Sequence, residues 1–192
     1  MINIIIKKIK SMRKISSFLE IIDLISDDTL VVLDIDDTII KYKDATRTWW
    51  KSRYDHHSNL SNDQNVINLN VQLEWKNLIK ISDPEFVDEV GLKQLYKKIK
   101  ETRNTDLIYL TARDETIKQL TEQHFNFLDL EHISNINYTA GGNKGEHLEN
   151  IIRQQYPDKN NYIFVDDFEH NIRHMKEACT YNVQCCKFIN PE

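Results

Sequence analysis

The sequence of 192 residues contains little glycine, proline or cysteine, with four, three and three residues of each. It has no internal repeat and no low-complexity tract, which excludes a repeat protein. The few glycines and prolines leave few obvious linkers. The length suits one domain with a full core and a small insertion, and is too short for two ordinary domains. We therefore expect a single domain over residues 1–192.

No apolar run approaches the roughly 20 residues that a membrane-spanning helix needs. Hydrophobic residues make up 40% and charged residues 29% of the chain, which is typical of soluble globular proteins. The three cysteines lie close together near the end, in a pattern of neither a disulfide framework nor a CxxC metal site. We expect a soluble protein in the reducing cytoplasm, with Cys185 and Cys186 buried in a strand.

The charge is unevenly distributed along the chain. The net charge is −5, but residues 1–14 hold five basic and no acidic residues, which leaves −10 for the remainder. An acidic body argues against a non-specific nucleic-acid binder. We interpret residues 1–14 as a solvated tail, with contact to an anionic surface as the alternative. Its apolar residues precede or interleave with its lysines, the reverse of a secretory signal.

Five short runs are apolar almost throughout, as expected for strands of a parallel sheet that is covered on both faces. These runs are residues 29–34, 106–111, 136–139, 161–166 and 183–188. Helical patterns separate them, over residues 91–102, 114–128, 144–156 and 167–181, and a further helix is expected over 16–25. Alternating strands and helices predict a doubly wound, Rossmann-like α/β domain with a five-stranded parallel sheet.

One interval does not fit this alternation. Residues 44–90 show no strand pattern, and a structureless loop of that length is improbable in a compact domain. We interpret the interval as a small, mainly helical cap inserted into the domain, with a helix near residues 68–80. The polar stretch 59–65 is expected to be a surface loop.

The stretch DIDDT places three aspartates directly behind the first predicted strand, at positions 34, 36 and 37. Clustered carboxylates repel one another unless a cation, hydrogen-bond donors or full exposure relieves them. Taken alone, the cluster also fits a solvated acidic turn. Other strand ends carry related chemistry: Thr111 ends the second run, Lys144 follows the third, and Asp166 and Asp167 end the fourth.

The carboxyl ends of parallel strands meet at one edge of a sheet, where ligands gather. Two acidic clusters there suit Mg²⁺, which prefers oxygen ligands and often binds substrate phosphate. A lysine and a hydroxyl beside the metal would position a phosphoryl group and stabilise its charge. The combined pattern therefore predicts phosphoryl chemistry at this edge.

The motifs DIDDT, LTAR, GGNKG and FVDDFEHN, in this order from residue 34 to 171, resemble the four motifs of the haloacid dehalogenase (HAD) superfamily. The sequence looks most similar to an acid-phosphatase-like branch of that superfamily. The resemblance implies that Asp34 is a nucleophile that forms an aspartyl-phosphate. It implies that Asp36 is the general acid and base, which favours a phosphatase over a dehalogenase.

The resemblance also implies that Thr111 binds the phosphoryl oxygens and that Lys144 neutralises charge. Asp34, the backbone carbonyl of Asp36, Asp166 and Asp167 would form the Mg²⁺ site, with Asp167 alternatively orienting Lys144. Asp37 and Thr38 would support the motif structurally. The implied activity is a phosphomonoester hydrolase acting on a small phosphorylated metabolite or nucleotide. A phosphatase of nucleic-acid ends or phosphoproteins, and a non-catalytic interaction protein, are the alternatives.

Several further residues have two interpretations each. Arg113 either reaches substrate phosphate or, as we favour, pairs with a nearby acid. Asn171 either orients the fourth motif or is an ordinary polar helix residue. The aromatic residues of the interval 44–90 either stack on a substrate ring or, as we favour, pack the core of the cap. His56 and His57 are expected to be exposed loop residues and not metal ligands.

Overall fold

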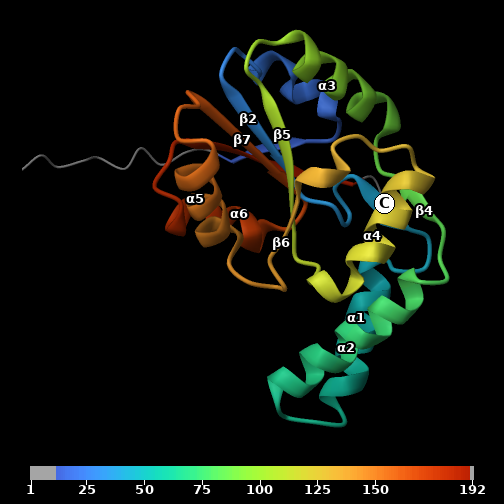
Figure 1. Ribbon diagram of the computed structural model, residues 1–192. Coiled ribbons are helices and arrows are strands. Elements are labelled where there is room, and N and C mark those ends of the chain that lie inside the picture. The colour runs from blue at the N-terminus through green and yellow to red at the C-terminus, as the bar shows by residue number, and fades with distance from the viewer. Residues whose placement is uncertain (1–11, 191–192) are drawn as a thin grey trace, which may run out of the picture.

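The computed structural model describes residues 12–190, and its core is a six-stranded sheet with the order β1-β8-β7-β2-β5-β6 (Figure 1). Every strand pairs in parallel with its neighbours, which confirms the predicted parallel sheet. The strands are β1 (Arg13–Ile15), β2 (Thr29–Leu33), β5 (Asp106–Thr111), β6 (Ile136–Tyr138), β7 (Asn161–Asp166) and β8 (Val183–Phe188).

The strand count of five was wrong because β1 was not recognised. This edge strand has only three residues, and Arg13 and Lys14 are exposed, so it carries no apolar run for a sequence pattern to detect. The rest of the basic segment, residues 1–11, lies outside the described residues. The buried strand cysteines are confirmed, since Cys185 and Cys186 are both buried in β8.

Helices cover both faces of the sheet, as Figure 1 shows. Val31 and Leu33 of β2 pack with the short helix η1 (Phe18–Leu24), α3 (Glu89–Glu101) and α4 (Lys118–Phe127). Leu30 and Val32 point to the other face and pack with α5 (Lys144–Gln155) and α6 (Glu169–Ala178). The alternation along β2 confirms the doubly wound arrangement.

The predicted helices are present, but two of the predicted helical segments contain or begin with 3₁₀ turns. Residues 16–25 contain a 3₁₀ helix, and the helix after β5 begins with the 3₁₀ turn η2 (Glu115–Ile117). Asp114 caps this turn by accepting a hydrogen bond of 3.0 Å from the Thr116 amide. Another 3₁₀ turn, η3 (Ile133–Asn135), precedes β6.

A hairpin of two helices, α1 (Arg47–Ser58) and α2 (Gln64–Ile79), projects from the domain in Figure 1. It lies between β3 (Ile40–Tyr42) and β4 (Pro84–Phe86), which pair antiparallel. The helix near residues 68–80 is confirmed. The expected absence of strands between residues 44 and 90 was wrong, because β4 has only three residues and shows no periodicity. Within the described residues, no helix is both long and apolar enough to cross a membrane.

The start of α5 lies unusually close to α6. A Cβ atom added to Gly145 would lie only 2.2 Å from the backbone oxygen of His174, so only glycine permits this approach. The contact matters for the site described below because Gly145 follows Lys144 directly.

We expect Gly145→Ala to lower the free energy of unfolding by about 1–3 kcal/mol, because the added methyl group forces α5 and α6 apart. Urea denaturation measures the change. Asn150→Ala, an exposed substitution on the same helix, is the control and should change stability by less than about 0.5 kcal/mol. Equal stability of the two variants would contradict the close packing.

Candidate active and metal site

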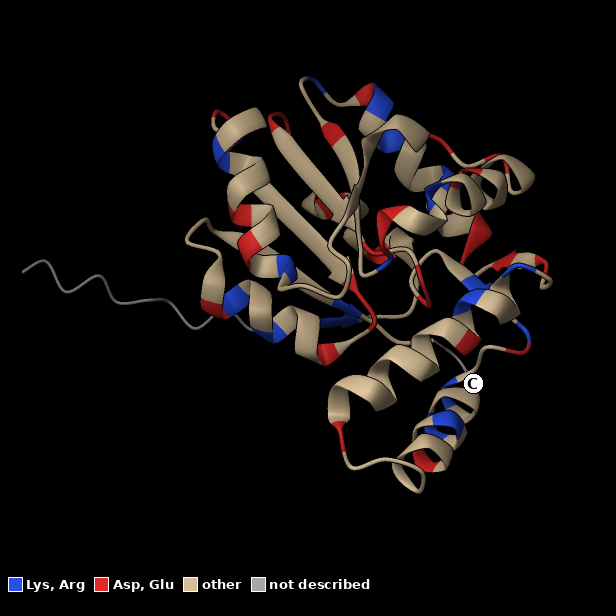
Figure 2. Ribbon diagram, turned by 60° about the horizontal axis from the view of Figure 1, so that its bottom comes forward, with Lys and Arg blue, Asp and Glu red and all other residues tan. Residues whose placement is uncertain are grey.

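The carboxyl ends of three adjacent strands bring together the residues singled out in the sequence. Asp34 directly follows β2, Asp166 ends β7 and Thr111 ends β5. The Asp34 amide donates a 2.9 Å hydrogen bond to the Val165 carbonyl, which extends the pairing of β2 with β7. Figure 2 shows acidic segments gathered between the sheet and the helical hairpin.

Lys144, at the first position of α5, lies between two of these carboxylates. Its Nζ contacts Oδ1 of Asp34 and lies 2.8 Å from Oδ2 of Asp166. The exposed fractions are 1% for Lys144, 5% for Asp34 and 0% for Asp166, so the three groups share one buried environment. The geometry therefore places one cation between two buried anions.

Burial raises the pKa of Asp34 well above its ordinary value, and Lys144 opposes this effect while Asp166 and Asp167 add to it. For Lys144 itself, burial acts to lower the pKa. The two carboxylates outweigh burial and hold the pKa of Lys144 above its ordinary value. Lys144 is therefore a charged ammonium group.

Hydrogen bonds orient the remaining carboxylates. The Asn171 amide donates to both oxygens of Asp166, at 3.1 and 3.0 Å, so the structure supports the orienting interpretation of Asn171. Thr38 Oγ1 donates to Asp34 over 3.2 Å and accepts from the Asp167 amide over 3.1 Å. Thr38 thus links the first acidic cluster to the second.

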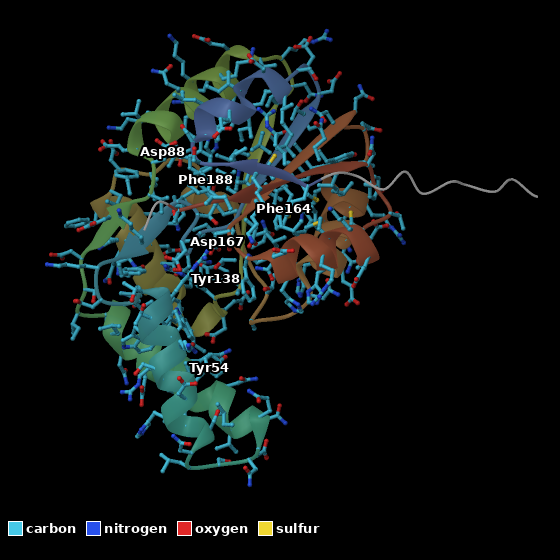
Figure 3. All side chains as sticks on the ribbon, turned by 180° about the vertical axis from the view of Figure 1, so that it is seen from behind. Tyr54, Asp88, Tyr138, Phe164, Asp167 and Phe188 are labelled. Carbon is cyan, nitrogen blue, oxygen red and sulfur yellow. The ribbon has the colours of Figure 1, made fainter. Side chains whose placement is uncertain are left out.

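Asp34, Asp166 and Asp167 can hold a metal ion. One carboxylate oxygen from each lies within 4.8 Å of the others. Burial, reinforced by Asp166 and Asp37, raises the pKa of Asp167 to about 7 even though Arg47 lies nearby. Oxygen donors that repel one another in a buried site suit a hard divalent cation, which would relieve the repulsion. Figure 3 shows Asp167 between the core, marked by Phe164, and the hairpin that carries Tyr54.

The Asp36 side chain points to a different partner. Arg113 holds it in a bidentate ion pair, with Nε 2.9 Å from Oδ2 and Nη2 2.7 Å from Oδ1. Arg113 is only 2% exposed, and Asp36 keeps the pKa of Arg113 above its ordinary value against the effect of burial. The favoured interpretation of Arg113, pairing with an acid, is confirmed.

Arg113 extends into a buried network that the sequence did not reveal. Its Nη2 donates to the Tyr42 hydroxyl over 2.8 Å, and that hydroxyl lies 2.7 Å from Nδ1 of His124. Its Nη1 donates to Thr121 over 3.0 Å. In the sequence, only the position of His124 on the apolar face of its helix indicated that this residue is buried. Burial and the charge of Arg113 lower the pKa of His124 to about 4, so His124 is neutral and accepts from Tyr42.

Thr111 is fully buried beside these groups. Leu33 pairs with Tyr109, so Thr111 lies level with residue 35, between Asp34 and Asp36 along the neighbouring strand. Its hydroxyl oxygen accepts a 3.1 Å hydrogen bond from the Arg113 amide. Among the described residues, the hydroxyl proton itself has no hydrogen-bond acceptor.

The helical hairpin packs its own aromatic core, as favoured from the sequence. Trp50 contacts Trp49, Tyr54 and Trp75, with ring centroids 5.4, 6.3 and 5.9 Å away. The expected loop position was wrong for both histidines, since His56 and His57 lie in α1. His56 is exposed as expected, whereas His57 is buried and bonds Glu74 over 2.9 Å. Helix α1 was not predicted because its buried side combines Trp50 and Tyr54 with the polar His57 and so forms no continuous apolar stripe.

Two ion pairs join the hairpin to the site. Arg47 of α1 lies 3.2 Å from Asp167, and Lys76 of α2 contacts Asp114, which follows Arg113. The hairpin is thus held above the acidic cluster from both of its helices.

Comparisons with known proteins give two similarities. Residues 134–186 match a family described as protein of unknown function (DUF2608). The chain is also similar to the HAD domain of the effector protein Lem4 from Legionella pneumophila, solved as an inactive mutant, with 15% identity and a TM-score of 0.44. That similarity covers 88% of this chain and 86% of the other chain. A comparison with curated protein sequences gives no match.

We expect Mg²⁺ to stabilise the protein through the three carboxylates. At about 100 times its dissociation constant, a ligand of the folded state adds about 2.7 kcal/mol of stability, measurable as a rise in unfolding temperature. Asp167→Asn should reduce this rise because it removes one charged ligand. Asp37→Asn, which removes a neighbouring carboxylate outside the group of three, should preserve it. An equal loss in both variants would indicate general charge screening instead of coordination.

We also expect His124 to make stability dependent on pH. The pKa of His124 is about 4 in the folded protein and 6.5 in an unfolded chain, so the unfolded state binds more protons between these values. Folding stability should therefore fall as the pH drops from about 6.5 to about 4, by up to about 3 kcal/mol from this residue. His124→Gln should lose less stability over that range in urea denaturation. Identical losses in the variant and the wild type would contradict the assignment.

Proposed function

We propose that the chain is a Mg²⁺-dependent phosphomonoester hydrolase of the HAD type that acts through an aspartyl-phosphate on Asp34. The observation that carries the proposal is the placement of Lys144 between Asp34 and Asp166, with Asp167 beside them, at the strand ends. This arrangement combines a buried carboxylate nucleophile, a fixed cation and a set of metal ligands. The resemblance of the four sequence motifs supports the same reaction.

In the first proposed step, a carboxylate oxygen of Asp34 attacks phosphorus, and the bond from phosphorus to the leaving oxygen breaks. For this step Asp36 carries a proton and keeps at most one of its two Arg113 contacts. It gives this proton to the leaving oxygen, so an alcohol departs. In the second step, water attacks phosphorus, Asp36 accepts a proton from the water, and the bond to Asp34 breaks to release phosphate. Asp34 and Asp36 thereby return to their starting forms.

The other residues bind and orient. Lys144 neutralises charge on Asp34 and on the transferring phosphoryl group, and the Thr111 hydroxyl donates to a phosphoryl oxygen. Asn171 fixes the Asp166 carboxylate, and Arg113 holds the Asp36 side chain. These contacts keep the reacting groups in place before the substrate arrives.

Asp34, Asp166 and Asp167, together with the backbone carbonyl of Asp36, would hold Mg²⁺. When bound, the ion supplies positive charge that stabilises the phosphoryl oxygens. The donor set fits because it consists of oxygens and because the buried carboxylates otherwise repel one another.

We further propose that the chain is one domain, in which residues 44–90 form a cap that selects the substrate. The ion pairs of Arg47 with Asp167 and of Lys76 with Asp114 support this proposal, because they join the hairpin to residues beside the site. A cap in this position surrounds a small molecule and excludes water from the reaction. It therefore favours a small phosphorylated metabolite or nucleotide over a nucleic-acid end or a phosphoprotein.

The test is hydrolysis of 4-nitrophenyl phosphate and a panel of phosphorylated metabolites by the wild type, with Mg²⁺ and with a chelator. We expect turnover only with Mg²⁺, and a loss on the order of 10³-fold or more in Asp34→Asn, because the nucleophile is removed. Asp37→Asn is the matched control and should retain most of the activity.

Circular dichroism shows whether each variant is folded. Turnover that persists in folded Asp34→Asn would contradict the aspartyl-phosphate route. A folded wild type that binds Mg²⁺ but hydrolyses no member of the panel would favour the non-catalytic alternative.

A further inference from the structure

A cavity of about 150 Å³ lies between the helical hairpin and the core of the domain. On the core side its wall includes Asp36, Tyr42 and Ala112, and on the hairpin side it includes Trp50, Gln72 and Trp75. The lining does not include Asp34, Lys144 or the metal-binding carboxylates. The cavity therefore opens on the general acid, where the leaving group departs, and not on the nucleophile.

One wall of the cavity is aromatic. The indoles of Trp50 and Trp75 contact each other, with centroids 5.9 Å apart and ring planes at 33°. This separation leaves no room for another ring between them, so they form one continuous surface. Tyr42, Ala45 and Ala112 add apolar surface beside it. A flat apolar group packs on such a wall better than a polar chain does.

The size of the cavity limits what it can hold. A cavity of about 150 Å³ with apolar walls accommodates one benzene-sized ring. The volume here is the same, so one ring fits within the walls.

The charges in the wall are already paired. Arg113 forms its ion pair with Asp36, and Lys76 forms its ion pair with Asp114. Asp37 also lines the cavity, so the five charged side chains sum to −1. No cation of the wall is left for an anionic group on the ligand. The Gln72 side chain makes no hydrogen bond among the described residues. It can therefore form a hydrogen bond with one polar atom of a bound ring.

We propose that the leaving group of the natural substrate is a single uncharged aromatic or heteroaromatic ring, held on the Trp50–Trp75 wall with its ester oxygen at Asp36. This inference rests on the proposed function and specifies its substrate class. It assigns Trp50, Trp75 and Gln72 to substrate binding in addition to their packing of the hairpin.

The experiment compares three phosphate esters in the wild type: benzyl, propyl and 4-carboxybenzyl phosphate. We expect kcat/KM for benzyl phosphate to exceed that for propyl phosphate by roughly 10- to 200-fold, the range that hydrophobic pockets achieve for small differences in size. The carboxyl group should lower kcat/KM by about tenfold or more, because the cavity offers it no unpaired cation.

Two adjacent, half-buried tryptophans of α1 give a matched pair of variants. Trp50 lines the cavity and Trp49 does not. We expect Trp50→Leu to reduce the preference for benzyl over propyl phosphate by about tenfold and Trp49→Leu to leave it unchanged. Circular dichroism shows whether both variants are folded.

Binding of benzylphosphonate, a non-hydrolysable analogue, is measured by calorimetry and should weaken in Trp50→Leu only. Tight, Trp50-dependent binding without hydrolysis of any ester would support the ring site and overturn the proposed reaction. Equal turnover of benzyl and propyl phosphate, an equal effect of both tryptophan variants, or no binding of benzylphosphonate would overturn the ring site.

Discussion

The contact of Lys144 with Asp34 and Asp166 is the interaction on which the site depends. Two carboxylates at the ends of neighbouring strands are forced together by the pairing of β2 with β7, and both are buried. Removing one partner of such a buried set typically costs about 3–5 kcal/mol, because the remaining charges are left uncompensated. Lys144, which permits the burial of these two carboxylates, is the first residue of α5. The start of α5 is held against α6 by the close approach at Gly145. Packing of two helices thus sets the position of the cation that the proposed reaction uses.

A second buried cation organises the opposite side of the site. Arg113 binds Asp36 from the core, bonds Tyr42 of β3 and lies 5.7 Å from the ring centre of Trp75 in the hairpin. One guanidinium therefore joins the general acid of the proposed reaction to the element proposed to select the substrate. Trp75 and Asp36 therefore both contact the same guanidinium group.

Much of the fold could be predicted from local pattern. The runs 29–34, 106–111 and 161–166 were recognisable because strands covered on both faces are apolar throughout. The short strands β1 and β4 escaped prediction because three residues show no periodicity, and their pairing partners are distant in the chain. Helix α1 was not predicted because its buried side mixes aromatic residues with His57, which gives no apolar periodicity.

The sequence by itself determined the parallel α/β architecture and the chemical inventory of the site, because side-chain periodicity and strand-end positions are local properties. Only the tertiary structure decided which partners the charged groups take. It paired Arg113 with Asp36, recruited Tyr42 and His124, and enclosed a cavity between the hairpin and the core. These contacts join residues up to 82 positions apart, and their geometry follows from packing in three dimensions and not from spacing along the chain.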